Sequence, residues 1–138
     1  MNILVIDAQG GGIGKQLVTA IKKNVENAYI TAIGTNYLAT SAMLKAGADQ
    51  AATGENAIIV NSRKADVIVG PIGIVIADSL LGEITPAMAV AIGQSDAKRI
   101  LIPINHCNNI IVGVEDLHIS KLLEAVITEI QNCLDCAD

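Results

Sequence analysis

Short runs of apolar residues alternate along the chain with stretches in which apolar residues recur every three or four positions. The runs predict buried strands, and the longer spacing predicts helices that place one face on a sheet. Strands that alternate with helices are typical of parallel β-α-β units. We therefore expect strands over residues 3–7, 29–33, 49–52, 66–70, 98–105 and 109–114.

Helices are expected between these strands. The helix that begins at Ile13 has an apolar residue at every fourth position, which keeps one side on the sheet. Thr35 or Asn36, then Thr53, and finally Asp116 are suitable N-caps for later helices. Residues 67–93 are expected to form a strand and then a long, very apolar helical region.

Right-handed crossovers between these strands predict an α/β fold with a doubly wound, Rossmann-like, mostly parallel sheet. The expected strand order is 3-2-1-4-5-6, with helices on both faces in a three-layer α/β/α arrangement. A length of 138 residues fits one domain, 1–138. In such sheets ligands bind beyond the carboxyl ends of the strands where the order reverses, here between the first and fourth strands.

Composition supports this fold and excludes some functions. The chain is 51% apolar, with no Phe or Trp and two tyrosines, and aliphatic packing of this kind suits a buried parallel sheet. A formal charge of −5 and few aromatics argue against nucleic-acid binding. Charges and prolines interrupt the most apolar stretch, which argues against a membrane span. Three cysteines and no signal peptide favour reduced thiols and a cytoplasmic location.

The loop after the first strand is the main candidate site. Gly10, Gly11, Gly12 and Gly14 leave the backbone amides uncovered just before a helix N-terminus. Free amides and the helix dipole both favour an anion there, so a phosphate or pyrophosphate is the natural ligand. We expect this ligand, a nucleotide or dinucleotide, to contact all of residues 9–14: Gln9, Gly10, Gly11, Gly12, Ile13 and Gly14.

The loop fits each known phosphate-binding motif imperfectly. As Gly-x-Gly-x-x-Gly it has Gln9 in place of the first glycine, and as the short-chain dehydrogenase motif it has Ala8 there. As a Walker loop it lacks both the first glycine and, at Gln16, the metal-binding hydroxyl. Dinucleotide-binding proteins also place an acidic residue after the second strand, where this chain has Gly34, Thr35 and Asn36. Thr35 and Asn36 remain candidates to bind a sugar.

Further candidates lie at the ends of other strands. Gly70 ends the expected fourth strand, and Pro71 and Gly73 follow it, on the other side of the expected reversal. Asn105 is the last residue of the expected fifth strand and is expected to contact the ligand.

Asp7 and His106 are the candidate acid or base of a catalysed reaction, although Asp7 is equally suited to cap the glycine turn. No metal site is expected, because Cys133 and Cys136 lie at a helix C-terminus with too few further ligands.

The apolar segment 67–93 also suggests self-association. Asp78 and Glu83 are its only charged residues, and a helix that is apolar on nearly all sides must be buried. One sheet face of a small domain is too little to cover it, so we expect a homo-oligomer that forms through this region.

Several blocks in this order resemble one family: the glycine loop, Gly34-Thr35-Asn36, residues 43–48, residues 53–57, and Gly70-Pro71-Ile72-Gly73. The chain is similar along nearly all of its length to a family of short bacterial proteins known only as a domain of unknown function. Ala8 departs from the family pattern, which has a glycine there. The resemblance implies the same fold and a bacterial cytoplasmic setting, and it implies no activity.

Three functions remain, and the third, an enzyme of the same fold that binds a small acyl or phosphosugar molecule, differs from the first mainly in its ligand. In the first, the chain binds a nucleotide or another phosphate-bearing small molecule at the glycine loop, with or without catalysis. In the second, it is a non-catalytic regulatory or assembly protein whose glycines only form tight turns. Gly11→Val is expected to abolish ligand binding in the first case and to leave assembly intact in the second.

Overall fold

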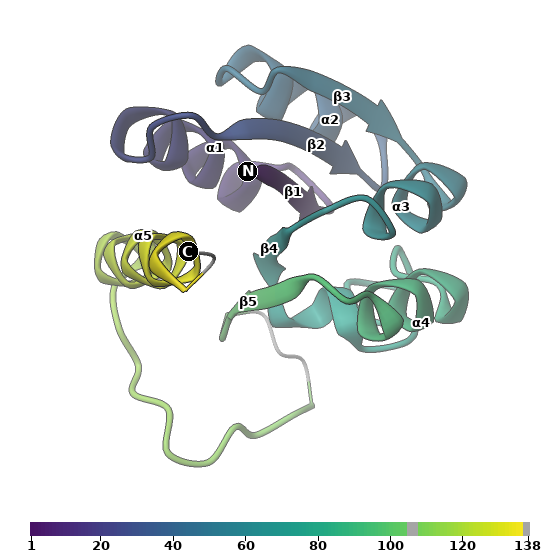
Figure 1. Cartoon of the computed structure of the whole chain (residues 1–138). Coiled ribbons are helices and arrows are strands. Elements are labelled where there is room, and N and C mark those ends of the chain that lie inside the picture. Colours follow the sequence, from purple (N-terminus) through teal and green to yellow (C-terminus); the bar gives the residue numbers. More distant parts are fainter. Residues whose placement is uncertain (105–107, 137–138) are drawn as a thin grey trace.

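A computed structural model describes residues 1–104 and 108–136, which form one sheet between two layers of helices (Figure 1). The five strands are β1 (Asn2–Asp7), β2 (Tyr29–Gly34), β3 (Gln50–Thr53), β4 (Val67–Pro71) and β5 (Lys98–Ile102). The helices are α1 (Gly12–Asn24), α2 (Tyr37–Lys45), α3 (Glu55–Ser62), the short 3-10 helix η1 (Ile72–Val75), α4 (Pro86–Gln94) and α5 (Ile119–Asp135).

The sheet has the strand order β3-β2-β1-β4-β5, and each adjacent pair is parallel. The first five strands therefore have the predicted order, and the α/β fold is confirmed. β1 lies in the centre and pairs with β2 on one side and β4 on the other. The order reverses between β1 and β4, so the carboxyl ends of these two strands define the expected ligand-binding edge.

Alternate residues of β1 enter two separate cores. Ile3 and Val5 pack on the side of α1, α2 and α5, whereas Leu4 and Ile6 pack on the side of α3, η1 and α4. This alternation follows from the two-residue period of a strand, and burial on both faces explains the continuous apolar run in the sequence. The three-layer arrangement is therefore confirmed.

The predicted sixth strand is wrong. Residues 109–114 form no strand, and the fifth strand, expected to reach residue 105, ends at Ile102. The length of the connection gives the reason. A parallel neighbour requires a crossover of about a dozen residues or more, and residues 103–108 supply only six.

The long helical region predicted after β4 is broken in the structure. Asp78, Leu80 and Leu81 adopt left-handed backbone conformations, with φ of 62°, 55° and 58°, between η1 and α4. α4 then starts anew at Pro86, and the Thr85 hydroxyl accepts a hydrogen bond from the Met88 amide. Proline at the first helical position after a threonine cap is a strong start signal.

Most of segment 67–93 is buried within the chain itself. The buried apolar residues of this segment after β4 are Ile74, Leu80, Ile84, Met88, Ala89 and Ile92, all in the second core. Leu81 and Val90 are exceptions, with 95% and 52% of their surfaces exposed. The reason given for self-association through this segment therefore fails, because the fold covers the apolar residues without a partner.

The observed helix N-caps match those predicted from the sequence only in part. Asn36 caps α2 by accepting a hydrogen bond from the Ala39 amide, as predicted. Gly54 takes the N-cap position of α3, and the Thr53 hydroxyl instead bonds to the Thr40 hydroxyl at 2.7 Å. α5 is preceded by His118, later than predicted from Asp116. Among the described residues, no helix combines the length and hydropathy that crossing a bilayer requires.

Candidate functional site

A hollow of about 260 Å³ opens at the carboxyl edge, between the loop after β1 and the segment after β4. Its volume is slightly below the roughly 300–1,000 Å³ of pockets that hold drug-sized ligands. The residues that line it are Asp7, Ala8, Gln9, Gly10, Gly11, Gly12, Ile13, Gln16, Pro71 and Leu80. The loop predicted to bind an anion therefore forms most of the wall.

Two of the four loop glycines are required by the fold. Gly11 has a φ of +74°, and a Cβ atom there would lie 2.7 Å from the Cα of Ala39. A Cβ on Gly14 would lie 2.8 Å from the Cβ of Asp7 and 2.5 Å from the sulfur of Met43. Both glycines allow α1 and α2 to pack closely. Gly11→Val therefore does not separate these functions, because it damages the fold in either case.

The other two glycines have no such structural reason. A Cβ atom on Gly10 or on Gly12 would meet nothing within 4 Å, and both residues are exposed. Neither has the positive φ that favours glycine. Both line the hollow. The absence of side chains here keeps the backbone accessible without any benefit to packing.

Three of the six amides in the loop are paired inside the protein. The amide of Gln9 donates to Glu83 Oε2 at 2.8 Å, that of Gly11 to the Ala8 carbonyl at 3.1 Å, and that of Gly14 to Asp7 Oδ2 at 2.7 Å. The amides of Gly10, Gly12 and Ile13 donate to no group in residues 1–104 and 108–136. These three lie at or just before the start of α1, where the helix leaves its first amides unpaired.

Asp7 lies beneath the loop with only 5% of its surface exposed. Burial raises the pKa of its carboxyl group, and the nearby Glu83 adds a smaller increase, while hydrogen bonds from the backbone of Gly14 and Ala8 oppose the shift. The carboxylate therefore acts as an internal cap for α1, and it also lines the hollow. Its predicted role as acid or base stays a prediction.

Glu83 is a site residue that the sequence analysis missed. Besides the Gln9 amide, its carboxylate accepts hydrogen bonds from the Thr35 hydroxyl at 3.1 Å and from Asn36 Nδ2 at 2.7 Å. Glu83 thus joins the loop after β1, the loop after β2 and the turn before α4. The sequence contained one signal that could have identified it: Glu83 is one of only two charged residues in the apolar segment 67–93.

Thr35 and Asn36 lie beside the glycine loop, as predicted, but their polar groups are used within the protein. Asn36 Nδ2 also donates to the Gln9 carbonyl at 2.9 Å, and its Oδ1 caps α2. A sugar on the β2 side of the loop would have to compete with Glu83 for both side chains. Their role in ligand binding stays a prediction.

Of the three candidates at the end of β4 and just beyond it, Gly70, Pro71 and Gly73, only Pro71 lines the hollow. A Cβ atom on Gly70 would lie 2.5 Å from the Ile6 carbonyl oxygen, and one on Gly73 would lie 3.1 Å from Ser79 Oγ. Both glycines are buried, and close packing explains them. Because neither glycine is exposed to solvent, the structure gives no support to their predicted contact with a ligand.

The remaining candidates are not part of this site as far as the structure describes it. Asn105 and His106 lie outside the described residues, so neither can be placed beside the hollow. Cys133 is partly buried near the end of α5 and Cys136 is exposed. Within the described residues, no group of three or more His, Cys, Asp or Glu side chains is arranged to hold a metal ion.

Comparison with known proteins gives a family and several similar chains of solved structures. The structure of a dodecameric FMN-dependent UbiX-like decarboxylase from Escherichia coli O157:H7 is similar to this chain with a TM-score of 0.45 and 12% sequence identity, over 98% of this chain and 94% of that one. No curated protein matches the sequence. The family match extends over residues 2–135. The chain therefore belongs to the family described as a domain of unknown function, DUF3842.

Proposed function

We propose that this protein binds a small phosphate-bearing molecule, such as a mononucleotide, in the hollow beside the glycine loop. The observation that supports the proposal most directly is the pair Gly10 and Gly12. Both line the hollow, and neither needs to be glycine for backbone conformation or packing. Because no side chain covers the backbone at these two positions, a ligand can contact the main chain directly.

The phosphate binds to the amides of Gly10, Gly12 and Ile13 in this proposal. These amides have no partner within the described residues, and they adjoin the N-terminus of α1. Unpaired amides and the positive end of the helix dipole both favour a negative charge here. The dipole alone contributes about 0.3–1 kcal/mol. The same position explains why the loop runs directly into a helix.

Glu83 restricts how the rest of the ligand lies. Its carboxylate already accepts hydrogen bonds from Thr35 and Asn36 on the β2 side of the loop. A second phosphate placed there would face a like charge. The ligand therefore extends toward Pro71 and Leu80, which favours a mononucleotide or sugar phosphate over a dinucleotide.

A calorimetric titration with inorganic phosphate, mononucleotides and sugar phosphates tests the proposal with Gly12→Leu. A leucine side chain at position 12 would project into open space and occupy the hollow. We expect at least one compound to bind the wild type, and Gly12→Leu to weaken it about tenfold or more, equivalent to 1.4 kcal/mol.

The matched control is Gly93→Leu. Gly93 is also an exposed helical glycine with nothing within 4 Å of its Cβ position, but it lies in α4 and does not line the hollow. This variant must bind as the wild type does. Absence of binding by the whole panel, or equal affinity of Gly12→Leu, would reject the ligand site.

If the ligand is also transformed, Asp7 is the described side chain best placed to exchange a proton with it. It lines the hollow, and burial raises the pKa of its carboxyl group above the ordinary value of an aspartate. Asp7→Asn keeps the size of the side chain and an acceptor for the Gly14 amide. We expect this variant to retain ligand affinity and to lose any turnover, measured by product formation with the compound that binds.

A further inference from the structure

The residues after β5 include an apolar segment without cover, which we call the arm (residues 110–116). Ile110, Val112 and Val114 are 88%, 93% and 46% exposed. From residue 108 to the start of α5, the chain lies away from the sheet and the helices (Figure 1). Contiguous exposed apolar residues are unusual on a monomeric protein and mark interaction sites.

The arm also has the pattern of a strand. Ile110, Val112 and Val114 are β-branched and stand at alternate positions, so in an extended conformation they share one face. This pattern is the one that predicted a sixth strand at 109–114. The structure shows the segment without a strand partner among the described residues.

β5 offers a place for such a strand. It lies at the end of the sheet, and among the described residues it pairs only with β4. Beside it, between β5 and α5, is a hollow of about 120 Å³ lined mainly by apolar side chains, including Ile100, Ile102, Leu122 and Val126. An open edge next to an apolar hollow favours the addition of an apolar strand.

The arm cannot reach its own β5. Parallel pairing is excluded because residues 103–108 are too few for a crossover. Antiparallel pairing would carry the end of the arm back along β5 by about 17 Å, at 3.4 Å per residue. Only residues 117–118 would then remain to return to Ile119 at the start of α5, and the three steps from Asp116 to Ile119 span at most about 11 Å.

We propose that the arm of a second copy of this chain adds to β5 as an antiparallel sixth strand. In the register that we propose, Val112 faces Ile102 and Val114 faces Ile100. Ile100 and Ile102 belong to the side of the sheet that α5 covers. Val112 and Val114 would therefore enter the apolar hollow beside α5.

Charge supports the same register. Continuing the pairing places Asp116 opposite Lys98 and Glu115 opposite Arg99, and all four residues are exposed in the single chain. Opposite charges at directly facing positions stabilise an antiparallel pair, whereas a shift by one residue would break both the charge pairing and the apolar face.

The exchange is reciprocal. Each chain has one arm and one open β5, so two copies related by a two-fold axis satisfy both edges and form a closed dimer. The proposal is independent of the phosphate site, which lies at the carboxyl edge between β1 and β4. The contact uses the arm rather than segment 67–93.

Sedimentation equilibrium of the full chain with Val112→Asp tests the contact. Val112 is 93% exposed in the single chain, so the substitution leaves the fold of each chain unchanged. We expect the wild type to be a dimer, and the dimer dissociation constant to rise about 100-fold or more in the variant, because a charge would enter an apolar hollow.

Leu81→Asp is the matched control, because Leu81 is 95% exposed and lies in segment 67–93. The control must remain a dimer. A wild-type protein that stays monomeric at millimolar concentration would overturn the proposal. So would a dimer that survives Val112→Asp, or one that Leu81→Asp dissociates to the same extent.

The register has its own test. Lys98→Asp and Asp116→Lys each place like charges opposite one another, and each is expected to weaken the dimer about three- to tenfold. The double variant restores opposite charges in reversed order, and its dissociation constant should return close to that of the wild type. Additive weakening in the double variant would overturn this register.

Discussion

The two glycine-containing loops at the reversal point of the sheet look alike in sequence but differ in structure. In the loop after β1, Gly10 and Gly12 face open space, whereas Gly70 at the end of β4 and Gly73 just beyond it both lie against other atoms of the protein. A glycine therefore indicates a ligand only where a side chain would have had room. The following predictions test this difference, from the largest expected effect to the smallest.

Gly70→Ala is expected to have the largest effect. Its Cβ atom would lie 2.5 Å from the Ile6 carbonyl oxygen, and both β1 and β4 are central strands that cannot move apart easily. We expect a loss of about 3 kcal/mol or more in the free energy of unfolding, measured by urea denaturation. If the variant is as stable as the wild type, the close packing of the second loop is not a constraint.

Glu83→Ala tests the contact that holds the first loop in place. The carboxylate has three hydrogen-bond partners, which are the Gln9 amide and the side chains of Thr35 and Asn36. Its removal is expected to lower the free energy of unfolding by about 2 kcal/mol. Glu26→Ala, at an exposed glutamate, is the control and should change stability by less than about 0.5 kcal/mol.

The two loops are held by different groups. The Asp7 carboxyl group accepts a hydrogen bond from the Gly14 amide in the first loop, whereas the Ser79 hydroxyl donates to the Gly73 carbonyl near the end of β4. Burial raises the folded-state pKa of Asp7 above 3.8, the ordinary value of an aspartate, so the folded protein keeps this proton to a higher pH than the unfolded chain does. As pH rises from 3.8 through the folded-state pKa, the contribution of Asp7 to stability is lost.

Asp7→Asn should therefore gain stability relative to the wild type as pH rises over that interval, measured by denaturation at several pH values. Asp49→Asn should do the opposite. The Lys22 side chain and the Ile30 amide lower the pKa of Asp49, so its contribution is present above 3.8 and is lost as pH falls. Equal pH profiles for the two variants would contradict the assignment.

Gly12→Ala is expected to have the smallest effect and the opposite sign to Gly70→Ala. Alanine fits the open helical position without strain and reduces the freedom of the unfolded chain. The free energy of unfolding should rise by about 0.4–1 kcal/mol, measured by urea denaturation. A decrease would show that Gly12 is required by the fold, and it would remove the main support for the phosphate site.

The strands and their order were predictable because apolar runs and connection lengths are local properties of the sequence. The same information excludes a parallel strand at 109–114, since six residues cannot cross back over the sheet. Glu83 was not predictable in this way, because it bonds to a loop 74 positions earlier in the chain. The environment of each glycine also depends on distant residues, such as Ala39 for Gly11.

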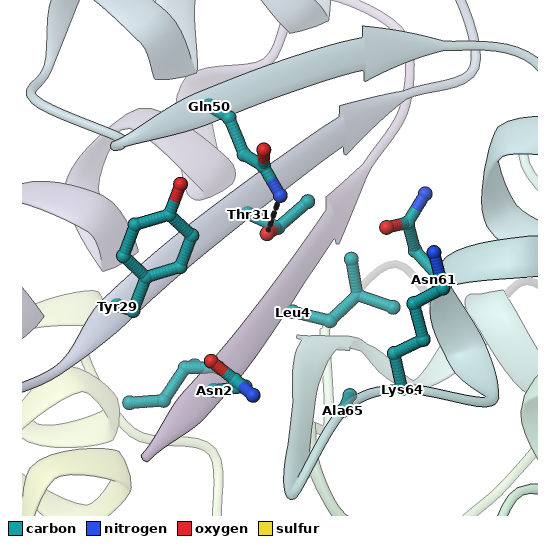
Figure 2. A pocket seen from close by; sticks show the side chains of 9 residues that line it. Asn2, Leu4, Tyr29, Thr31, Gln50, Asn61, Lys64 and Ala65 are labelled. Carbon is teal, nitrogen blue, oxygen red and sulfur yellow. Dashed lines mark hydrogen bonds between the residues drawn. The ribbon is translucent and has the colours of Figure 1, made fainter.

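Because the core is built from aliphatic residues, the protein contains few groups that absorb ultraviolet light. The chain has no tryptophan, and its two tyrosines, Tyr29 and Tyr37, are 47% and 78% exposed. Tyr29 lines a small hollow at the amino edge of the sheet, together with Thr31 and Gln50 (Figure 2). With two tyrosines and no tryptophan, the polypeptide absorbs ultraviolet light weakly. A nucleotide that stays bound through purification would therefore be visible directly in the absorbance spectrum.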